Sequence, residues 1–332
     1  MHLPELGEKG VLVTGGAGFI GAHLVDALVE RGARVRVLDD LSTGRRDNLE
    51  HLDGRIELVE GDVRSFDACR RAAEGTALVF HQAALGSVPR SMADPATTLA
   101  VNAGGTANVF AACREAGVRR VVYASSSSVY GDSATLSKRE GEEGEPLSPY
   151  AASKAVGETL GRVFARCYPL EPVGLRYFNV YGPRQDPEGP YAAVIPHFVS
   201  AALAGRPATI YGDGEQSRDF TFVADAVAAN LLAAGAPASV AGRAYNVASG
   251  RRTTVLELAR LVAETVGGAP PPVHEAPRPG DVPHSLADLT RVREDLGYEP
   301  RISLADGLAA SLGYYRELAG RGGDPWRGGV HR

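Results

Sequence analysis

The sequence contains few residues of the kinds that cross-link or anchor a chain. Its three cysteines, Cys69, Cys113 and Cys167, are odd in number and widely spaced, which excludes a disulfide framework and a cysteine zinc cluster. We expect all three to lie in helices as small apolar residues. No apolar run has membrane-spanning length, and the N-terminus lacks a signal-peptide profile, so we expect a cytoplasmic protein.

Lysine is also scarce, since only Lys9, Lys138 and Lys154 occur among 35 basic residues. A lysine that persists in an arginine-rich chain is a candidate for chemistry that arginine cannot perform. The net charge is −5 and there is no basic run, so neither nucleic acid nor a membrane is expected as a partner. No metal site is indicated either, because the chain has no HExxH motif and no carboxylate cluster.

What the sequence has in abundance is glycine, and its densest cluster follows an apolar run at 10–14. Gly15, Gly18 and Gly21 have the spacing GxxGxxG, and an apolar-periodic helix is predicted over 19–31. Such a turn brings backbone close to a pyrophosphate and points the N–H groups of the helix start at it. The alternative is an ordinary glycine turn, but its position between a strand and a helix favours a dinucleotide site.

An acidic pair supports the same interpretation. The apolar run 34–38 ends in Asp39 and Asp40, about twenty residues beyond the glycine turn, where a ribose-binding acid is expected. Two acids there would repel a 2′-phosphate, so the pattern favours NAD over NADP.

Strand and helix patterns alternate through the first half of the chain. This alternation predicts an α/β fold: a Rossmann-type, doubly wound parallel sheet with a smaller, partly interleaved C-terminal α/β substrate domain. We expect an NAD-binding domain over 1–178, a return segment near 223–250, and a second domain over 179–332. The predicted strands are 10–14, 34–38, 56–60, 77–81, 119–124, 172–177, 208–211 and 244–247. The predicted helices are 19–31, 65–73, 94–116, 149–167, 192–204, 223–235, 254–266 and 303–318.

Tyr150 and Lys154 stand four residues apart at the start of a predicted helix, and therefore on one face. A nearby cation and the helix N-terminus both favour a phenolate, so Tyr150 is a candidate general base. A surface pair on an amphipathic helix is the competing interpretation. The serines 125–128 favour the general-base interpretation, because they follow a predicted strand at the sheet edge where ligands bind.

The ordered motifs together resemble the extended short-chain dehydrogenases/reductases of the nucleotide-sugar epimerase group, and the likeness covers nearly the whole chain. The matching pieces are TGGAGFIG at 14–21, GDV at 61–63, HQAA at 81–84, Asn102 with Gly105-Thr106, SSSSVYG at 125–131, YxxxK at 150–154, RYFNVYGPR at 176–184, GDG at 212–214, RDF at 218–220 and RPGD at 278–281.

The resemblance implies a role for each matching residue. Tyr150 would be the acid/base, Lys154 would lower its pKa and hold the nicotinamide ribose, and Ser126 would share the proton path. The implied NAD contacts are Gly15, Gly18, Phe19, Ile20, Asp39, Asp62, Val63, Ala83, Ala84, Asn102, Tyr150, Lys154 and Tyr177. The implied substrate contacts are Gly86, Ser87, Ser126, Ser127, Asn179, Gln185, Ala193, Val194, Tyr211, Arg218, Arg278, Asp281 and Ser285.

The implied reaction is inversion at carbon 4 of a UDP-sugar through a 4-keto intermediate, with tightly bound NAD. Galactose-restricted relatives place tyrosine at the position of Ser285. Serine there, with the small Gly86 and Ala193, favours UDP-GlcNAc and UDP-GalNAc, with UDP-Glc and UDP-Gal as lesser substrates. A homodimer built from the helices predicted over 94–116 and 149–167 is also implied.

Three other functions compete with this interpretation. A 4,6-dehydratase needs an Asp-Glu pair where Ser127 and Ser128 stand. A UDP-glucuronate 4-epimerase shares SSSSVYG but typically has threonine at Asn179. A non-catalytic NAD-binding regulatory protein is disfavoured because Tyr150 and Lys154 are both present.

Overall fold

The computed structural model describes residues 9–187, 193–277 and 284–320. The chain divides into two compact units. The first comprises 1–177, 224–247 and 288–299, and the second comprises 178–223, 248–287 and 300–332. Each unit is described by itself.

The first unit is built on a seven-stranded sheet in which every strand pair is parallel. The strand order is β12-β7-β5-β4-β1-β2-β3, so the direction of winding reverses between β1 and β4. The predicted doubly wound sheet is therefore confirmed, and the reversal marks the edge where such folds bind ligands. The strands are β1 (Gly10–Thr14), β2 (Val35–Asp39), β3 (Ile56–Glu60), β4 (Thr76–His81), β5 (Arg120–Ser126), β7 (Glu171–Tyr177) and β12 (Ala244–Val247).

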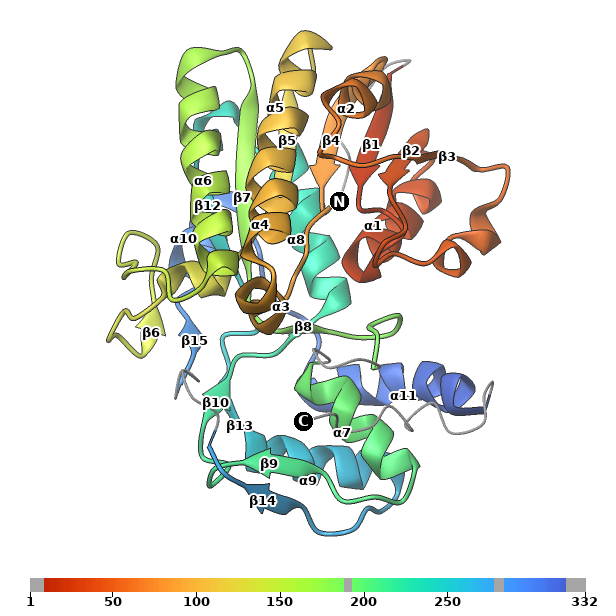
Figure 1. Cartoon of the computed structure of the whole chain (residues 1–332), viewed down its shortest axis with the longest axis vertical. Coiled ribbons are helices and arrows are strands. Elements are labelled where there is room, and N and C mark those ends of the chain that lie inside the picture. The colour runs from red at the N-terminus through yellow and green to blue at the C-terminus, as the bar shows by residue number, and fades with distance from the viewer. Residues whose placement is uncertain (1–8, 188–192, 278–283, 321–332) are drawn as a thin grey trace. The chain divides into compact units, whose positions relative to one another are not determined.

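The helices of this unit cover the sheet because their apolar faces pack on it. A buried cluster that includes Phe110, Cys113, Tyr123 and Leu170 joins sheet and helices, and Figure 1 shows α5 and α6 side by side along the strands. All three cysteines lie in helices as predicted, although Cys167 is exposed. The helices are α1 (Phe19–Glu30), α2 (Phe66–Ala73), α3 (Val88–Ala93), α4 (Pro95–Leu99), α5 (Gly105–Glu115), α6 (Pro149–Cys167), α8 (Val223–Gly235) and α10 (Thr290–Leu296).

The single helix predicted over 94–116 is interrupted. A π-helical turn, Ala100–Gly104, separates α4 from α5, and the short helix α3, which we did not predict, precedes them. Periodicity shows the apolar face of such a stretch but not a one-turn change in hydrogen bonding. Because π-turns occur frequently at functional sites, Asn102 within this turn merits attention.

The second unit packs three helices around a core of its own that contains Phe198, Leu258 and Leu308. The helices are α7 (Val194–Leu203), α9 (Val255–Val266) and α11 (Leu304–Gly320). Its strands form short two-stranded ladders: β8 (Val180–Tyr181) with β11 (Thr221–Phe222), β9 (Thr209–Tyr211) with β14 (Val273–Glu275), and β10 (Ser217–Arg218) with β13 (Thr253–Thr254). Ladders of two or three residues are too short to predict from alternation.

No helix among the described residues is long and apolar enough to span a membrane.

Candidate active site

The glycine turn leads from β1 directly into α1. Gly15 has a φ of +69°, and a Cβ there would lie 2.5 Å from the backbone nitrogen of Ala83. A Cβ on Gly21 would collide with the carbonyl oxygen of Gly15, so both positions require glycine. Helix α1 begins after Gly18 with no side-chain cap and no acid in its first turn. The N–H groups at its start therefore suit the pyrophosphate of a dinucleotide.

Asp39 stands at the end of β2, beside this turn. Its two carboxylate oxygens accept hydrogen bonds from the backbone N–H groups of Ala17 and Leu41, each at 2.9 Å. Burial raises the pKa of Asp39 despite these bonds. Asp62 differs because Arg64 pairs with it and lowers its pKa. The carboxylate beside the turn that suits a ribose is therefore that of Asp39.

Asn102 connects the end of β4 to α6. Its side-chain amide donates to the carbonyl of Leu85 and to Oγ of Ser153, and its Oδ1 accepts from the N–H of Leu85 at 2.8 Å. Ser153 directly precedes Lys154, so this amide links the loop after β4 to the start of α6. Asn102 is buried.

Tyr150 and Lys154 occupy the first turns of α6, opposite the end of β5. The side chain of Ser126, the last residue of β5, lies beside the Tyr150 hydroxyl and acts to lower its pKa. The ammonium of Lys154 donates to the carbonyl of Ala124 at 2.8 Å and lies 5.9 Å from the centre of the Tyr150 ring. The structure thus brings together the three residues predicted to carry the chemistry.

The pKa of Tyr150 differs from our expectation. Burial raises it, and the Ser126 side chain opposes that effect only in part. Burial also lowers the pKa of Lys154 to about 8, which leaves its ammonium charged at neutral pH. The sequence predicted the proximity of the two groups but not the desolvation that accompanies it.

Tyr177, at the end of β7, belongs to a closed ring of three side chains. Its hydroxyl donates to Gln82 at 3.2 Å and accepts from Asn230 at 2.7 Å, while the amide of Gln82 donates to Asn230 at 3.1 Å. Burial raises the pKa of Tyr177 to about 12, so it stays neutral. Gln82 lies within the HQAA motif at 81–84, but no sequence signal identified Asn230.

In the second unit, Asn179 and Arg218 lie close to the buried residue Asp219. Asn179 has a φ of +36°, and its side-chain amide donates to the backbone carbonyl of Asp219 at 3.0 Å. The Asp219 carboxylate accepts from the N–H and Oγ of Ser249, from the N–H of Gly250 and from the N–H of Ala287. Asp219 therefore joins three chain segments, a role that its place in the RDF motif did not reveal.

Two other predicted substrate residues also lie in this unit. Ser285 is tied to the same segments, because its N–H donates to the carbonyl of Ser217 at 3.0 Å. Gln185 donates to the carbonyl of Val180, but its buried Oε1 has no hydrogen-bond partner among the described residues. A buried acceptor without a partner is costly, so this oxygen suits an N–H or O–H group of a ligand.

Comparison with known proteins decides the family. The model of the NAD dependent epimerase/dehydratase family matches residues 11–248. The chain belongs to that family.

Relatives from other organisms resemble the chain over nearly its whole length. It is 43% identical over 309 residues to a UDP-glucose 4-epimerase of Mycolicibacterium smegmatis, which covers 92% of this chain and 98% of that protein. A UDP-N-acetylglucosamine 4-epimerase from Methanobrevibacter ruminantium, solved with UDP-N-acetylmuramic acid, has a TM-score of 0.89 at 38% identity and covers 94% of this chain and 99% of its own. A Thermus thermophilus UDP-glucose 4-epimerase in complex with NAD has a TM-score of 0.83 at 38% identity, covering 92% and 98%.

Relatives with other chemistry are also found. A UDP-N-acetyl-alpha-D-glucosaminuronate decarboxylase of Bacillus cytotoxicus is 33% identical over 321 residues, 94% of this chain and 99% of that protein. Membership of the epimerase/dehydratase family therefore establishes the fold and NAD dependence without selecting the sugar.

The remaining predicted substrate contacts differ in how the structure places them. Ser87 caps α3 by accepting from the N–H of Arg90, so its hydroxyl is already in use. Ala193 precedes α7 and is exposed, and a Cβ on Gly86 would meet no described atom within 4 Å. Arg278 and Asp281 lie outside the described residues. Within the described chain, no group of three or more His, Cys, Asp or Glu side chains could hold a metal ion.

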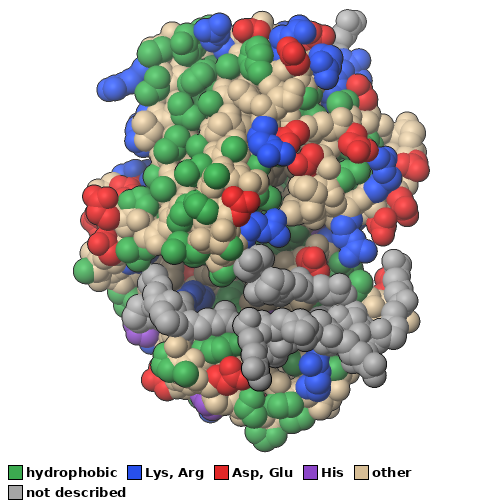
Figure 2. Space-filling view, viewed as in Figure 1, with side chains coloured by type: hydrophobic (Ala, Val, Ile, Leu, Met, Phe, Trp, Pro, Cys, Tyr) green, Lys and Arg blue, Asp and Glu red, His purple; other side chains and the backbone are tan. Residues whose placement is uncertain are grey.

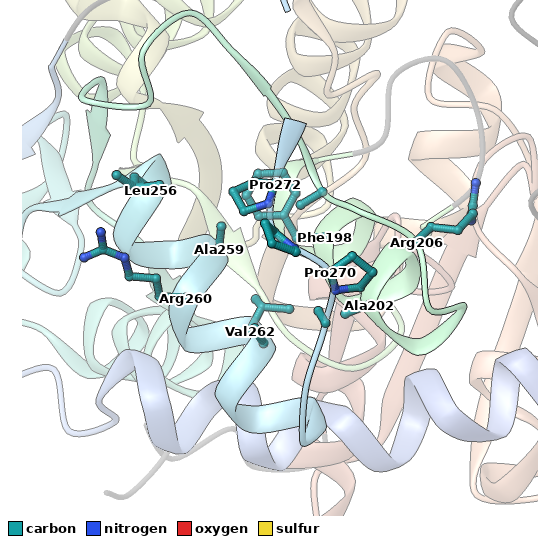
Figure 3. A pocket seen from close by; sticks show the side chains of 13 residues that line it. Phe198, Ala202, Arg206, Leu256, Ala259, Arg260, Val262, Pro270 and Pro272 are labelled. Carbon is teal, nitrogen blue, oxygen red and sulfur yellow. The ribbon is translucent and has the colours of Figure 1, made fainter. Parts of the chain in front are cut away.

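A cavity of about 300 Å³ in the second unit contains none of the predicted site residues. Figure 3 shows it between α7, α9 and the prolines that precede β14, with Phe198 and Val262 among its apolar lining. Arg206 and Arg260 stand at its rim and point away from it.

Proposed function

We propose that the protein is an NAD-dependent 4-epimerase of UDP-sugars. The observation that carries the proposal is the convergence of Ser126, Tyr150 and Lys154 at the end of β5, in the unit that also contains the glycine turn. The epimerases among the relatives support the UDP-sugar class. We propose that the first unit supplies NAD binding and proton transfer, and that the second supplies UDP contacts.

The residues present suit NAD. The turn at Gly15 and Gly18 would hold the diphosphate, Asp39 a ribose, and Lys154 the nicotinamide ribose. NAD, when bound, supplies reversible hydride transfer at carbon 4 of the sugar.

The chain's own residues would move the proton. The Tyr150 phenolate would take the proton of the sugar 4-hydroxyl, with the Ser126 hydroxyl bridging the two. It would return the proton after the 4-keto sugar has rotated to present its opposite face. The Lys154 ammonium would favour the phenolate because it carries the opposite charge. Since Asn179 and Arg218 would hold the nucleotide end, the sugar could turn while the diphosphate stays bound.

We further propose that N-acetylated sugars are preferred. Ser285 is small, Gly86 has open space around its Cα, and Gln185 carries an unpartnered buried acceptor that could receive an acetamido N–H or a sugar hydroxyl. Plain hexoses would still bind, because missing atoms cost less than clashes. Ser127 and Ser128 offer no acid to expel water, which disfavours dehydration.

The test is incubation of the purified protein, without added NAD, with UDP-GlcNAc, UDP-Glc and UDP-glucuronate, followed by NMR of the products. We expect C4 epimers of the first two, formed faster from UDP-GlcNAc. Tyr150→Phe should abolish turnover and leave UDP binding intact. Product from UDP-glucuronate alone would move the assignment to that epimerase, and no epimer from any of the three would overturn it.

A substitution at Ser285 tests the preference for N-acetylated sugars separately. Ser285→Tyr should reduce turnover of UDP-GlcNAc selectively because the larger ring would overlap the acetamido group, whereas Ser285→Ala should affect both sugars alike. An equal loss on both sugars in Ser285→Tyr would show that Ser285 does not set the preference.

We also propose a homodimer through α4 and α6. Leu99, Val156 and Val163 on these helices are large apolar side chains that are 40%, 43% and 44% exposed, and α4 and α6 contact each other. Figure 2 shows hydrophobic side chains over the face that α4, α5 and α6 form in Figure 1. Light scattering should give twice the chain mass, and Val163→Arg should shift the protein toward monomer. A monomeric wild type would refute this.

A further inference from the structure

Helix α6 and strand β5 contact each other in a series of layers that begins at the catalytic residues. One turn after Lys154, Glu158 accepts a hydrogen bond of 2.6 Å from Oγ of Ser125. Its two carboxylate oxygens also accept from Nε and Nη2 of Arg176, which forms a bidentate ion pair. The layers, from the catalytic end, are Tyr150 with Ser126, Lys154 with Ala124, Glu158 with Ser125, and Gly161 with Tyr123. The position of the whole helix face against β5 therefore determines where Tyr150 lies.

The last layer is the tightest. A Cβ on Gly161 would lie 2.6 Å from Oη of Tyr123, 3.1 Å from Cζ and 3.2 Å from Cε1. The ring cannot retreat, because a Cβ on Gly174 of β7 would lie 2.8 Å from both its Cζ and its Oη. Phe110 packs against the same ring at 5.4 Å between centroids, and Tyr123 is 2% exposed. Helix α6 thus lies as close to β5 as a residue without a side chain permits.

The Tyr123 hydroxyl makes no compensating polar contact. Its oxygen is buried and has no hydrogen-bond partner within the described chain, which costs free energy. Phenylalanine would avoid that cost. What the hydroxyl does provide is length, since it is the atom nearest to Gly161.

We propose that Tyr123 and Gly161 are positioning residues, whose contact sets the spacing between α6 and β5 and thereby brings Tyr150 to Ser126. This inference deepens the proposed function and rests on Tyr150 acting as its acid/base. An α-helix is stiff over the three turns from Tyr150 to Gly161, so a displacement at Gly161 is carried to the catalytic end. Because proton transfer demands hydrogen-bond distance, a shift there affects chemistry more than binding.

The same helix offers a matched control. A Cβ on Gly157 would meet only Cγ2 of Thr106, at 3.9 Å, so alanine fits there. Gly157→Ala and Gly161→Ala both add one methyl group to α6, yet only the second should push the helix away from β5.

The test compares kcat, KM for UDP-GlcNAc and UDP-Glc, and bound NAD in wild type, Gly157→Ala, Gly161→Ala, Tyr123→Phe and the double variant Gly161→Ala/Tyr123→Phe. We expect Gly157→Ala to stay within about twofold of wild type. Tyr123→Phe, which removes the atom that spaces α6 from β5, should lose about threefold to tenfold in kcat with KM unchanged. Gly161→Ala should lose on the order of tenfold or more in kcat with KM unchanged. The double variant should regain most of that loss, because the nearest atom has been removed.

Several outcomes would overturn the proposal: wild-type kcat in Gly161→Ala, an equal loss in Gly157→Ala, or no recovery in the double variant. If Gly161→Ala does not fold, Tyr123→Leu tests the same contact, since removing the spacer should lower kcat at unchanged KM. Failure of the proposed function is recognised separately, as an inactive wild type. In that event, crystal structures still decide, because Gly161→Ala should lengthen the distance between the Tyr150 and Ser126 hydroxyl oxygens.

Discussion

The Nδ1 atom of His81, at the end of β4, lies 2.7 Å from Oγ1 of Thr14, at the end of β1. On the other side of the ring, Nε2 lies 3.0 Å from Oγ1 of Thr106, which donates its own proton to the carbonyl of Asn102. In the neutral imidazole, Nε2 therefore carries the ring proton and Nδ1 accepts from Thr14. This chain of hydrogen bonds links the strand before the glycine turn to the π-turn that contains Asn102, and burial favours its neutral imidazole.

Acid should destabilise the protein through this histidine. Burial and the nearby Lys154 lower the pKa of His81 to about 3, whereas the unfolded value is 6.5. Below pH 6.5 only the unfolded chain takes up this proton, so stability falls with pH, by about 2 kcal/mol at pH 5. Urea unfolding at pH 7.5 and 5 should show this loss in wild type and in His51→Asn, but not in His81→Asn. The same pH dependence in all three would contradict the prediction.

The buried charge of Lys154 should lower the stability of the protein. Burial lowers the pKa of Lys154 from 10.5 to about 8, so below pH 8 the folded protein bears the full penalty of a buried charge. That penalty disappears as pH rises from 8 to 10.5. Lys154→Met should therefore be more stable than wild type by up to about 3 kcal/mol at pH 7 and by less than about 1 kcal/mol at pH 10.

The exposed Lys9 supplies the control for this measurement. Lys9→Met should match wild type in the free energy of unfolding at both pH values. A Lys154→Met variant that is less stable than wild type at pH 7 would show that the contact of Lys154 with Ala124 outweighs desolvation.

Breaking the ion pair between Glu158 and Arg176 should be costly. The two side chains are 5% and 4% exposed, and Glu158→Gln would remove one of the two carboxylates that pair with Arg176, leaving Glu143. We expect a loss of about 1.5–3 kcal/mol in the free energy of unfolding, the range for hydrogen bonds to charged groups. Glu57→Gln, which removes the partner of Arg36 in an exposed pair, should cost less than about 1 kcal/mol. Equal losses would indicate that burial does not govern the Glu158 pair.

Asp219 should control nucleotide binding from outside the ligand contacts. In Asp219→Asn, an amide N–H₂ would face backbone donors where a carboxylate oxygen now accepts, and the segments that carry Arg218 and Ser285 would loosen. Calorimetry should show UDP binding weakened by roughly tenfold, the effect of about one lost charge-assisted hydrogen bond. Bound NAD should be unchanged, because its proposed residues lie in the first unit.

The exposed Asp213, in the same unit, provides the matched substitution. Asp213→Asn retains an oxygen to accept from the N–H of Glu215 and should bind UDP as wild type does. Equal weakening in both variants would show that charge in general, rather than the contacts of Asp219, is responsible.

Local patterns sufficed for much of the fold and the site. The strand, turn and helix around Gly15 and the pairing of Tyr150 with Lys154 depend on residues within a few turns of each other, so their spacing is informative. The π-turn at Ala100–Gly104 escaped prediction because its apolar periodicity does not differ from that of an α-helix. The pKa of Tyr150 escaped it because desolvation depends on everything packed around the ring.

Sequence patterns were enough to predict the parallel sheet, the glycine turn between β1 and α1 and the placement of Tyr150 and Lys154 on one helix, since backbone propensities and side-chain periodicity act locally. Only the tertiary structure showed that Glu158 pairs with Arg176, that Asn230 closes a ring with Gln82 and Tyr177, and that Tyr123 stands between Gly161 and Gly174. These contacts join residues on different elements, and their energies depend on burial and distance. Neither quantity exists until the chain has packed.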